Sequence, residues 1–369
     1  MVSNETFTIP FLQRCQRQLE ISDVTILERT VHAFCLLERM TLSKLDFVFK
    51  GGTSLMLLLD KPLRISTDID IVCRVPEKQF EDELKKWIRF PPFTRWERDY
   101  RASDTEPPCK CHYFIYFNSQ FGDRMESYVI LDVVAEDCGI KAEHTICKLI
   151  DCQFLKLEGT PSKVTIPTVD ALLGDKLTAF APNTTGVSFH DPRRLGDSSH
   201  QVLKQLFDIG QLFDHLTDLR VVRDSYFSVL EKEGGYRKIT GLPECALYDT
   251  LQTSYEICTF ESRRQKLPND AFIRKGIKSM ASDLINQTQF SFPQARVAAA
   301  KAAYLVALLL TDGRKKDYAQ SEDVVAELKM YEFPKELGVL NPLKKVSAEA
   351  FWYWREIYRM LPNMEKLLR

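Results

Sequence analysis

The sequence predicts a mixed α/β (α+β) fold with a small mixed sheet, followed by an α-helical bundle. The chain has 369 residues, more than one hydrophobic core usually accommodates, so we expect two domains. Strand and helix patterns alternate as far as residue 167, and from Thr168 nearly every periodic segment is helical. We therefore predict one domain over residues 1–167 and a second over residues 168–369.

The composition excludes several classes of protein. Hydrophobic residues make up 44% of the chain and charged residues 27%, as in ordinary globular proteins. A net charge of −1 gives no overall field that attracts nucleic acid, so such binding needs local basic patches. The N-terminus does not resemble a secretory signal. The apolar segment 295–310 is interrupted by Arg296 and Lys301 and is short for a membrane span, so we expect a buried helix of a bundle there. Ten scattered cysteines fit reduced thiols, and we expect a cytoplasmic protein with no membrane partner.

The elements of the first domain follow from the spacing of apolar residues. Helical periodicity between residues 10 and 45 predicts one or two helices before the first strand. The expected elements after them are a strand at 45–49, a helix at 53–59, a strand at 65–75, a helix at 80–88, a connecting loop at 91–110, strands at 111–117 and 128–134, and a strand pair over 154–166 bent at Gly159.

The second domain is predicted to be helical throughout. Thr168 is a suitable N-cap for a helix that begins at Val169 and ends before Pro182. A loop rich in Pro, Gly and Ser follows, up to residue 199. Further helices are expected at 200–216, 246–262, 270–286, 294–310, 321–331 and 348–361.

Two aspartates in the predicted strand 65–75 are the first candidates for chemistry. Side chains alternate along a strand, so Asp68 and Asp70 project from one face while Ile69 and Ile71 point to the core. Neighbouring carboxylates repel each other, and a divalent cation between them removes that repulsion. Hard oxygen ligands of this kind suit Mg²⁺, with Mn²⁺ as the alternative ion.

A glycine turn lies just upstream of these aspartates. Gly51, Gly52, Thr53 and Ser54 join a strand to a helix, and backbone N–H groups at a helix start, together with a Ser hydroxyl, bind phosphate readily. The turn lacks the lysine of a P-loop. The same residues also fit an ordinary strand-to-helix connection with an N-cap.

Asp132 is a single carboxylate within the apolar strand 128–134. A buried, unpaired carboxylate is costly, so Asp132 requires a cation, a basic partner or solvent. It is either a third ligand beside Asp68 and Asp70 or the partner of Arg64 or Lys50 in an ion pair.

Polar residues of the second domain are the remaining candidates. Lys176 lies off the apolar stripe of its predicted helix and is free to reach a phosphate. Lys204 and Asp208 are four residues apart on the next helix and share a face. On spacing alone, that pair is a surface ion pair of little energetic weight.

The motifs in these regions resemble one family. The segments FKGGTS at 49–54 and RISTDID at 64–70 resemble the first motif of the AbiEii/AbiGii toxin-type nucleotidyltransferases, members of the DNA polymerase β-like superfamily. The segments LGDKLTAF at 173–180 and KQLFDI at 204–209 resemble that family's paired lysine and aspartate motifs. One departure is Asp175, where the family often has Glu.

The resemblance implies an enzyme that binds NTP and Mg²⁺ and adds nucleotides to the 3′ end of tRNA. It also implies the toxin of a type IV toxin–antitoxin or abortive-infection pair, acting in phage defence and neutralised by a separately encoded antitoxin. Residues 1–167 would be the nucleotidyltransferase domain, and residues 168–369 would complete the nucleotide cleft. The implied catalytic residues are Asp68, Asp70, Asp132, Lys176 and Asp208, the first three as metal ligands. The implied nucleotide-binding residues are Gly51, Gly52, Thr53, Ser54, Arg64, Ser66 and Lys204.

Two other functions remain open at this point. A nucleotidyltransferase that modifies a protein or a small molecule would share all of these residues, and so would a nucleotide-binding regulatory protein without turnover. Basic residues within 89–110, with Trp96 and Tyr100 among them, either hold an RNA strand or form a solvated loop. Basic clusters also occur at 263–266, 274–278 and 314–316. They either border the groove that would hold this RNA strand or are solvated surface.

Overall fold

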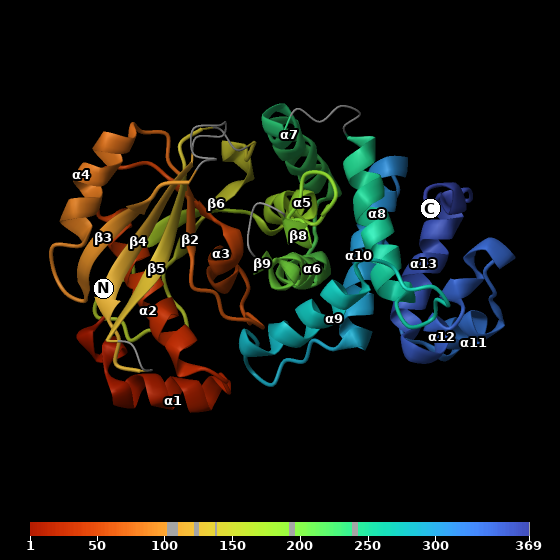
Figure 1. Cartoon of the computed structure of the whole chain (residues 1–369), viewed down its shortest axis with the longest axis horizontal. Helices are drawn as coiled ribbons and strands as arrows, with labels where there is room; N and C mark the ends of the chain where they lie inside the picture. The colour runs from red at the N-terminus through yellow and green to blue at the C-terminus, as the bar shows by residue number, and fades with distance from the viewer. Residues whose placement is uncertain (102–109, 122–124, 137–138, 192–195, 238–242, 369) are drawn as a thin grey trace. The chain divides into compact units, whose positions relative to one another are not determined.

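The fold is taken from a computed structural model of the chain. It describes residues 1–101, 110–121, 125–136, 139–191, 196–237 and 243–368. The chain divides into two compact units (Figure 1). The first contains Met1–Thr168 and Ser282–Thr288, and the second contains Val169–Ala281 and Gln289–Arg369.

The first unit combines helices with a small mixed sheet, and the predicted fold class is confirmed. Its helices are η1 (Asn4–Phe7), α1 (Ile9–Leu19), α2 (Val24–Thr41), α3 (Gly51–Leu58), α4 (Glu77–Trp87) and η3 (Ala142–His144). Its strands are β1 (Val48–Lys50), β2 (Ile69–Val72), β3 (Phe93–Asp99), β4 (Lys110–Asn118), β5 (Glu126–Val134), β6 (Thr145–Leu149) and β7 (Lys163–Pro167).

Five of these strands form one sheet in the order β1-β2-β5-β4-β3 (Figure 1). β2 and β5 are parallel, and the other neighbours are antiparallel. Alternate side chains such as Ile69, Ile71, Leu131 and Tyr113 are buried on one face, where α2 packs against β5 and α4. The other face carries the polar residues of the candidate site.

Two expected elements of the first unit differ in the structure. β3 occupies Phe93–Asp99, within the segment predicted to be a loop. A register shift between Phe93 and Arg95 breaks the alternation of apolar and polar residues by which a strand is recognised in a sequence. β7 overlaps the predicted strand pair over 154–166, but its partner is β6, upstream of that pair. β6 was not predicted. Its apolar residues Ile146 and Leu149 do not alternate with polar residues, and both are exposed in the structure.

A short segment from late in the chain completes the first unit. The backbone N–H of Ile65 donates to the carbonyl of Asp283 at 2.7 Å, and the N–H of Ile285 donates to the carbonyl of Leu63 at 3.1 Å. Arg64 and Leu284 form the β-bridge between these bonds. The predicted second domain includes every residue after 167, so the position of Ser282–Thr288 in the first unit corrects that prediction.

The second unit is built almost entirely of helices. They are α5 (Val169–Ala179), α6 (Ser199–Asp214), α7 (Leu219–Arg237), α8 (Glu244–Thr259), α9 (Asp270–Ser279), η4 (Met280–Ser282), α10 (Phe292–Thr311), α11 (Glu322–Met330), η5 (Lys335–Leu340), α12 (Leu343–Val346), α13 (Ala348–Met360) and η6 (Met364–Lys366). The short strands β8 (His190–Asp191) and β9 (Gly196–Asp197) pair with each other. The sequence analysis did not predict α7, although Val222, Tyr226, Val229 and Leu230 are buried along it at helical spacing.

α10 is the central helix of the second unit. It has 20 residues and is long and apolar enough to cross a membrane, which corrects the expectation that this segment is too short. However, 78% of its apolar stretch is buried inside the protein, where it packs against α6, α8 and α13. Its two cations are paired, Arg296 with Glu261 at 2.7 Å and Lys301 with Asp214 at 2.6 Å. α10 therefore has the surroundings of a core helix.

Candidate active site

The candidate site is a row of polar residues across the five-stranded sheet. Asp70 of β2 lies opposite Asp132 of β5 in parallel register, and Lys50 of β1 lies opposite Asp70 on the other side. His112 of β4 lies opposite Asp132, and Asp99 of β3 lies opposite His112. Residues in register on neighbouring strands share a face and are about 5 Å apart, so the carboxylates of Asp70 and Asp132 are neighbours.

Asp68 belongs to the same region. It immediately precedes β2 and lies two residues before Asp70, and its side chain accepts a hydrogen bond from Thr67 Oγ1 at 3.1 Å. Asp68, Asp70 and Asp132 are all partly exposed. The three sequence-predicted carboxylates therefore lie on two neighbouring strands or immediately before one of them, and all three are accessible to solvent.

Asp132 has a histidine partner that the sequence analysis did not identify. His112 Nδ1 lies 2.6 Å from Asp132 Oδ1. Arg101 Nη1 lies 3.4 Å from His112 Nε2, and Arg101 Nε donates to Asp99 Oδ2 at 2.7 Å. A guanidinium only donates, so Nε2 accepts and the Nδ1 proton is directed at Asp132.

The structure gives Asp132 a basic partner, which was one of the alternatives, and among the described residues that partner is His112 rather than Arg64 or Lys50. A role of Asp132 as a third metal ligand stays a prediction. The Asp132 side chain is 32% exposed, so it also has access to solvent. Strands 111–117 and 128–134 were both predicted, and only their antiparallel register was needed to place His112 beside Asp132.

The glycine turn packs directly against the two ends of the aspartate motif. Gly51 has φ +77°, a left-handed conformation that favours glycine, and a Cβ atom there would overlap the Asp70 carboxylate. A Cβ atom on Gly52 would overlap the guanidinium of Arg64 and lie 3.2 Å from Ser66 Oγ. The structure therefore joins segments 49–54 and 64–70 into one compact feature.

Two hydroxyls of the turn have internal partners. Thr53 Oγ1 donates to the carbonyl of Asp68, and Ser54 Oγ donates to the carbonyl of Gly51 at 2.9 Å. Both residues are fully buried. Ser54 was expected to present its hydroxyl to a phosphate, but in the structure it holds the turn together.

Positive charge near the turn comes from Arg64, which is only 5% exposed. Its Nη1 donates to the carbonyl of Ile65 at 3.2 Å, and its backbone is fixed by the bridge to Leu284. α3 starts at Gly51, and its N-cap residue Lys50 offers no side-chain acceptor to the first-turn N–H groups. A helix start of this kind, next to a guanidinium, is suited to phosphate.

The donor set fits a hard divalent cation by its chemistry, because neighbouring carboxylates are the ligands that Mg²⁺ prefers in proteins. In the part of the chain that the structure describes, no three His, Cys, Asp or Glu side chains form a metal-binding cluster. The structure thus provides Asp70 and Asp132 as neighbours, with Asp132 oriented by His112 and Asp68 two residues from Asp70.

In the second unit, Lys176 and Asp208 form a buried ion pair. Lys176 Nζ lies 2.9 Å from Asp208 Oδ2 and donates to Gln205 Oε1 at 3.0 Å. Asp208 is completely buried and Lys176 is 5% exposed. The position of Lys176 off the apolar stripe predicts a free side chain, but in the structure Lys176 is paired and buried. Asp208 is likewise buried and does not belong to a surface ion pair. Lys204 is half-buried.

Gly174, in the motif that contains Lys176, allows two helices to pack closely. A Cβ atom on Gly174 would meet the backbone of α7, with Val222 O at 2.7 Å and Tyr226 N at 2.8 Å. α5 and α7 approach closely at this point, and this contact fixes the helix that carries Lys176.

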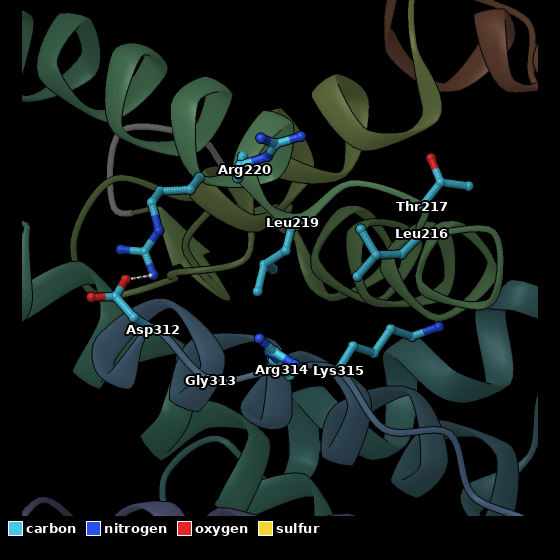
Figure 2. Close-up of a pocket in the computed structure, with 9 residues that line it drawn as sticks. Leu216, Thr217, Leu219, Arg220, Asp312, Gly313, Arg314 and Lys315 are labelled. Carbon is cyan, nitrogen blue, oxygen red and sulfur yellow. Dashed lines mark ion pairs between the residues drawn. The ribbon is translucent and has the colours of Figure 1, made fainter.

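A separate pocket in the second unit is lined by basic residues. It has a volume of about 410 Å³ and lies between the start of α7 and the residues that follow α10, as Figure 2 shows. Its lining includes Arg220, Arg223, Arg314 and Lys315, and Arg223 pairs with Asp312. The sequence left two alternatives for the basic cluster at 314–316, the border of a groove or solvated surface. In the structure Arg314 and Lys315 of this cluster line a pocket.

The basic residues at 89–110 are largely engaged within the first unit, as far as they are described. Arg95 pairs with Glu126 at 2.6 Å, and Arg98 pairs with Glu77 at 2.7 Å. Both lie on β3, so they are not part of a solvated loop. Residues 102–109 lie outside the described part of the chain.

Neighbouring carboxylates on a mixed sheet, next to a glycine turn that opens a helix, are features that a nucleotidyltransferase requires. The chain belongs to the nucleotidyl transferase AbiEii toxin family of type IV toxin–antitoxin systems, whose sequence model matches residues 36–301. Membership of the family predicted from the motifs is thus confirmed. The family implies an NTP substrate and an antitoxin partner.

Solved structures with low sequence identity were also found. The nucleotidyltransferase toxin MenT4 from Mycobacterium tuberculosis H37Rv is 12% identical, with 98% of this chain and 99% of that chain covered and a TM-score of 0.45. JHP933 from Helicobacter pylori is 13% identical, with 84% and 93% covered and a TM-score of 0.41. No curated protein sequence matches the chain.

Proposed function

We propose that this nucleotidyltransferase adds nucleoside monophosphates from an NTP to the 3′ end of an RNA, with tRNA as the acceptor. The observation that carries the proposal is the parallel register of Asp70 and Asp132 beside the Gly51–Gly52 turn. Two carboxylates and a phosphate-binding helix start are then within reach of one triphosphate. The free 3′ hydroxyl of an RNA is a nucleophile that suits this chemistry.

In the proposed step, the 3′ oxygen of the acceptor forms a bond to the α-phosphorus of the NTP. The bond from that phosphorus to the oxygen bridging the β-phosphate breaks, and pyrophosphate leaves. The hydroxyl proton passes to a carboxylate of the site. Asp132 is suited to accept it, because His112 fixes one of its oxygens and the side chain remains open to solvent.

The ligands of the proposed cation are Asp68, Asp70 and Asp132. Bound Mg²⁺, or Mn²⁺ in its place, would supply positive charge to the phosphate oxygens. Arg64 and the N–H groups of the turn would bind the same phosphates from the protein side. We also propose that Lys176 contacts the triphosphate and that Asp208 positions Lys176, a role that their ion pair supports.

The biological setting that we propose follows from the family. The protein would act in the cytoplasm as the toxin of an abortive-infection or toxin–antitoxin pair that protects against phage, and a separately encoded antitoxin would neutralise it. Modification of RNA 3′ ends would block translation if the acceptor is tRNA.

The test is transfer of label from each α-labelled NTP to deproteinised cellular RNA, to cell protein and to small-molecule acceptors, with Mg²⁺ or Mn²⁺ present. We expect label in an RNA band of tRNA size, and no label with Asp70→Ala at an unchanged melting temperature. Label in protein or in a small molecule alone would refute the RNA proposal. Full transfer by Asp70→Ala would refute the assignment of the site.

A further inference from the structure

We propose that an aromatic platform on the outer face of the sheet stacks the unpaired bases at the 3′ end of the acceptor. The platform consists of Phe114 and Tyr116 on β4 and Tyr128 and Ile130 on β5. The inference rests on the proposed function, because it gives the RNA acceptor a binding surface next to the carboxylates.

The platform is apolar where a polar surface is expected. An antiparallel sheet with one face on the core usually exposes polar residues on the other face. Here Tyr116 lies opposite Tyr128 and Phe114 lies opposite Ile130 on the face away from the core. The Phe114 and Tyr128 ring centroids are 4.8 Å apart, and those of Tyr116 and Tyr128 are 5.7 Å apart. Tyr128 is 37% exposed, so this cluster is accessible.

The platform is continuous with the row of carboxylates. His112, Phe114 and Tyr116 follow one another on the same face of β4, as do Asp132, Ile130 and Tyr128 on β5. Each step of two residues is about 7 Å along a strand. An acceptor whose 3′ hydroxyl lies at Asp132 can therefore place its last two bases over the platform.

The direction in which the bound RNA runs from Asp132 also follows from the residues on this face of the sheet. On the other side of the row, the next pair in the ladder is Lys110 and Val134, which has no aromatic ring. Bases stack on aromatic side chains with little preference for sequence. The terminal bases therefore have a stacking surface on the platform side of Asp132 only, as far as the described residues of β4 and β5 extend.

Arg95 extends the platform onto β3. Its guanidinium lies 3.5 Å from the centre of the Tyr116 ring and pairs with Glu126 at 2.6 Å. The Tyr116 hydroxyl donates to Glu97 at 2.7 Å. These contacts hold a flat cation over an aromatic ring, and single-stranded RNA stacks on guanidinium planes as well as on rings.

The occupant that fits these features is single-stranded RNA rather than a protein. The platform is next to the residues at which the acceptor hydroxyl is proposed to react, and its accessible groups include the Tyr128 ring, which is 37% exposed, and the Arg95 side chain, which is 43% exposed. A protein partner or a second copy of this chain that covered the platform would block access from that side to Asp132. Such a protein contact is the outcome that competes with RNA stacking in the experiment.

The experiment compares Tyr128→Leu, which keeps an apolar side chain but removes the ring, with Phe90→Leu, which removes an exposed aromatic residue away from the platform. Binding is measured with an RNA that carries 2-aminopurine next to its 3′ end, because stacking quenches that fluorophore. Transfer is measured as KM for RNA and KM for NTP separately. Tyr128→Phe tests whether the ring alone is sufficient.

We expect quenching with the wild-type protein, Phe90→Leu and Tyr128→Phe, and its loss with Tyr128→Leu. In Tyr128→Leu the RNA dissociation constant and the KM for RNA should rise about tenfold, as expected for one stacked base, while the KM for NTP stays unchanged. Melting temperatures show whether each variant is folded.

The results separate the two proposals. If the wild-type protein labels RNA and Tyr128→Leu binds and labels it equally well, the platform is refuted and the proposed function stands. If Tyr128→Leu changes only the oligomeric mass or the affinity for antitoxin, the platform is a protein interface and the inference is refuted. If the wild-type protein labels a different class of acceptor, both proposals are refuted.

Discussion

Gly51 lies so close to Asp70 that a side chain at position 51 would overlap the Asp70 carboxylate. The backbone of the turn therefore forms one wall of the carboxylate site. It does so in a left-handed conformation at φ +77°, which most residues avoid. Two separate physical requirements thus select glycine at this position.

Gly51→Ala should abolish nucleotidyl transfer and lower stability. Alanine in the left-handed region costs about 1–2 kcal/mol, and the overlap with Asp70 adds to that cost and displaces the carboxylate. Gly159→Ala is the matched control, because Gly159 has φ +70° with no atom within 4 Å of an added Cβ. Thermal unfolding and label transfer should show a loss of stability in both variants and a loss of activity only in Gly51→Ala. Equal activity of the two variants would contradict the contact.

His112→Leu should reduce kcat by about 10- to 100-fold, the usual effect of removing the partner of a metal ligand, which is the role proposed for Asp132. The reason is that His112 fixes the orientation of Asp132. His112→Asn keeps a donor and should recover part of the rate. Mn²⁺ binding to the protein without nucleotide, measured by calorimetry, should weaken in the same order. An unchanged Mn²⁺ affinity in His112→Leu would argue against a positioning role.

Asp208→Ala should destabilise the protein by about 3–5 kcal/mol, since it leaves Lys176 buried without its carboxylate. The double variant Lys176→Met/Asp208→Leu removes both charges and should be more stable than Asp208→Ala. Unfolding in urea measures this difference. If Lys176 contacts the triphosphate, the double variant remains inactive despite its stability. Activity in that variant would limit the pair to a structural role.

Stability should decrease when the pH falls from about 6.5 towards 4. Burial lowers the pKa of His32 to about 4, although its Nδ1 donates to the carbonyl of Glu28 at 2.7 Å. Its ring is stacked on Phe117 with centroids 3.6 Å apart. Below pH 6.5 the unfolded chain protonates this histidine while the folded protein does not, so acid favours unfolding, by roughly 3 kcal/mol at pH 4.

His32→Phe keeps a ring in the stack and removes the titration. The slope of unfolding free energy against pH should therefore be shallower between pH 4 and 6.5 in His32→Phe than in the wild-type protein. Parallel curves for the two proteins would show that another group causes the acid sensitivity.

The sequence was most informative where chemistry and local pattern coincide. Asp68, Asp70 and the Gly51–Ser54 turn were placed next to each other because the strand, turn and helix that carry them are contiguous. Asp132 was identified because a carboxylate within an apolar strand is unusual. Its partner His112 was missed, because pairing between β4 and β5 depends on register, which a single sequence does not specify.

Burial was the other property that the sequence did not provide. Lys176 and Ser54 were expected to face a ligand, since both are polar and lie beside apolar residues. In the fold each is buried and has an internal partner, Asp208 for Lys176 and the Gly51 carbonyl for Ser54. The missing information is tertiary, because only the packing of neighbouring helices decides which polar groups are enclosed.

Ser282–Thr288 belongs to the first unit although it is synthesised late, and this affects when the first unit can finish folding during translation. During synthesis, the bridge that fixes Arg64 beside the glycine turn has no partner until Leu284 has left the ribosome. That residue is made more than a hundred residues after Thr168, which takes roughly 6–24 seconds at ordinary elongation rates. A nascent chain that ends before Leu284 thus lacks the bridge that supports Arg64 beside the glycine turn. We therefore expect an unfinished chain to have a less ordered turn than the complete protein.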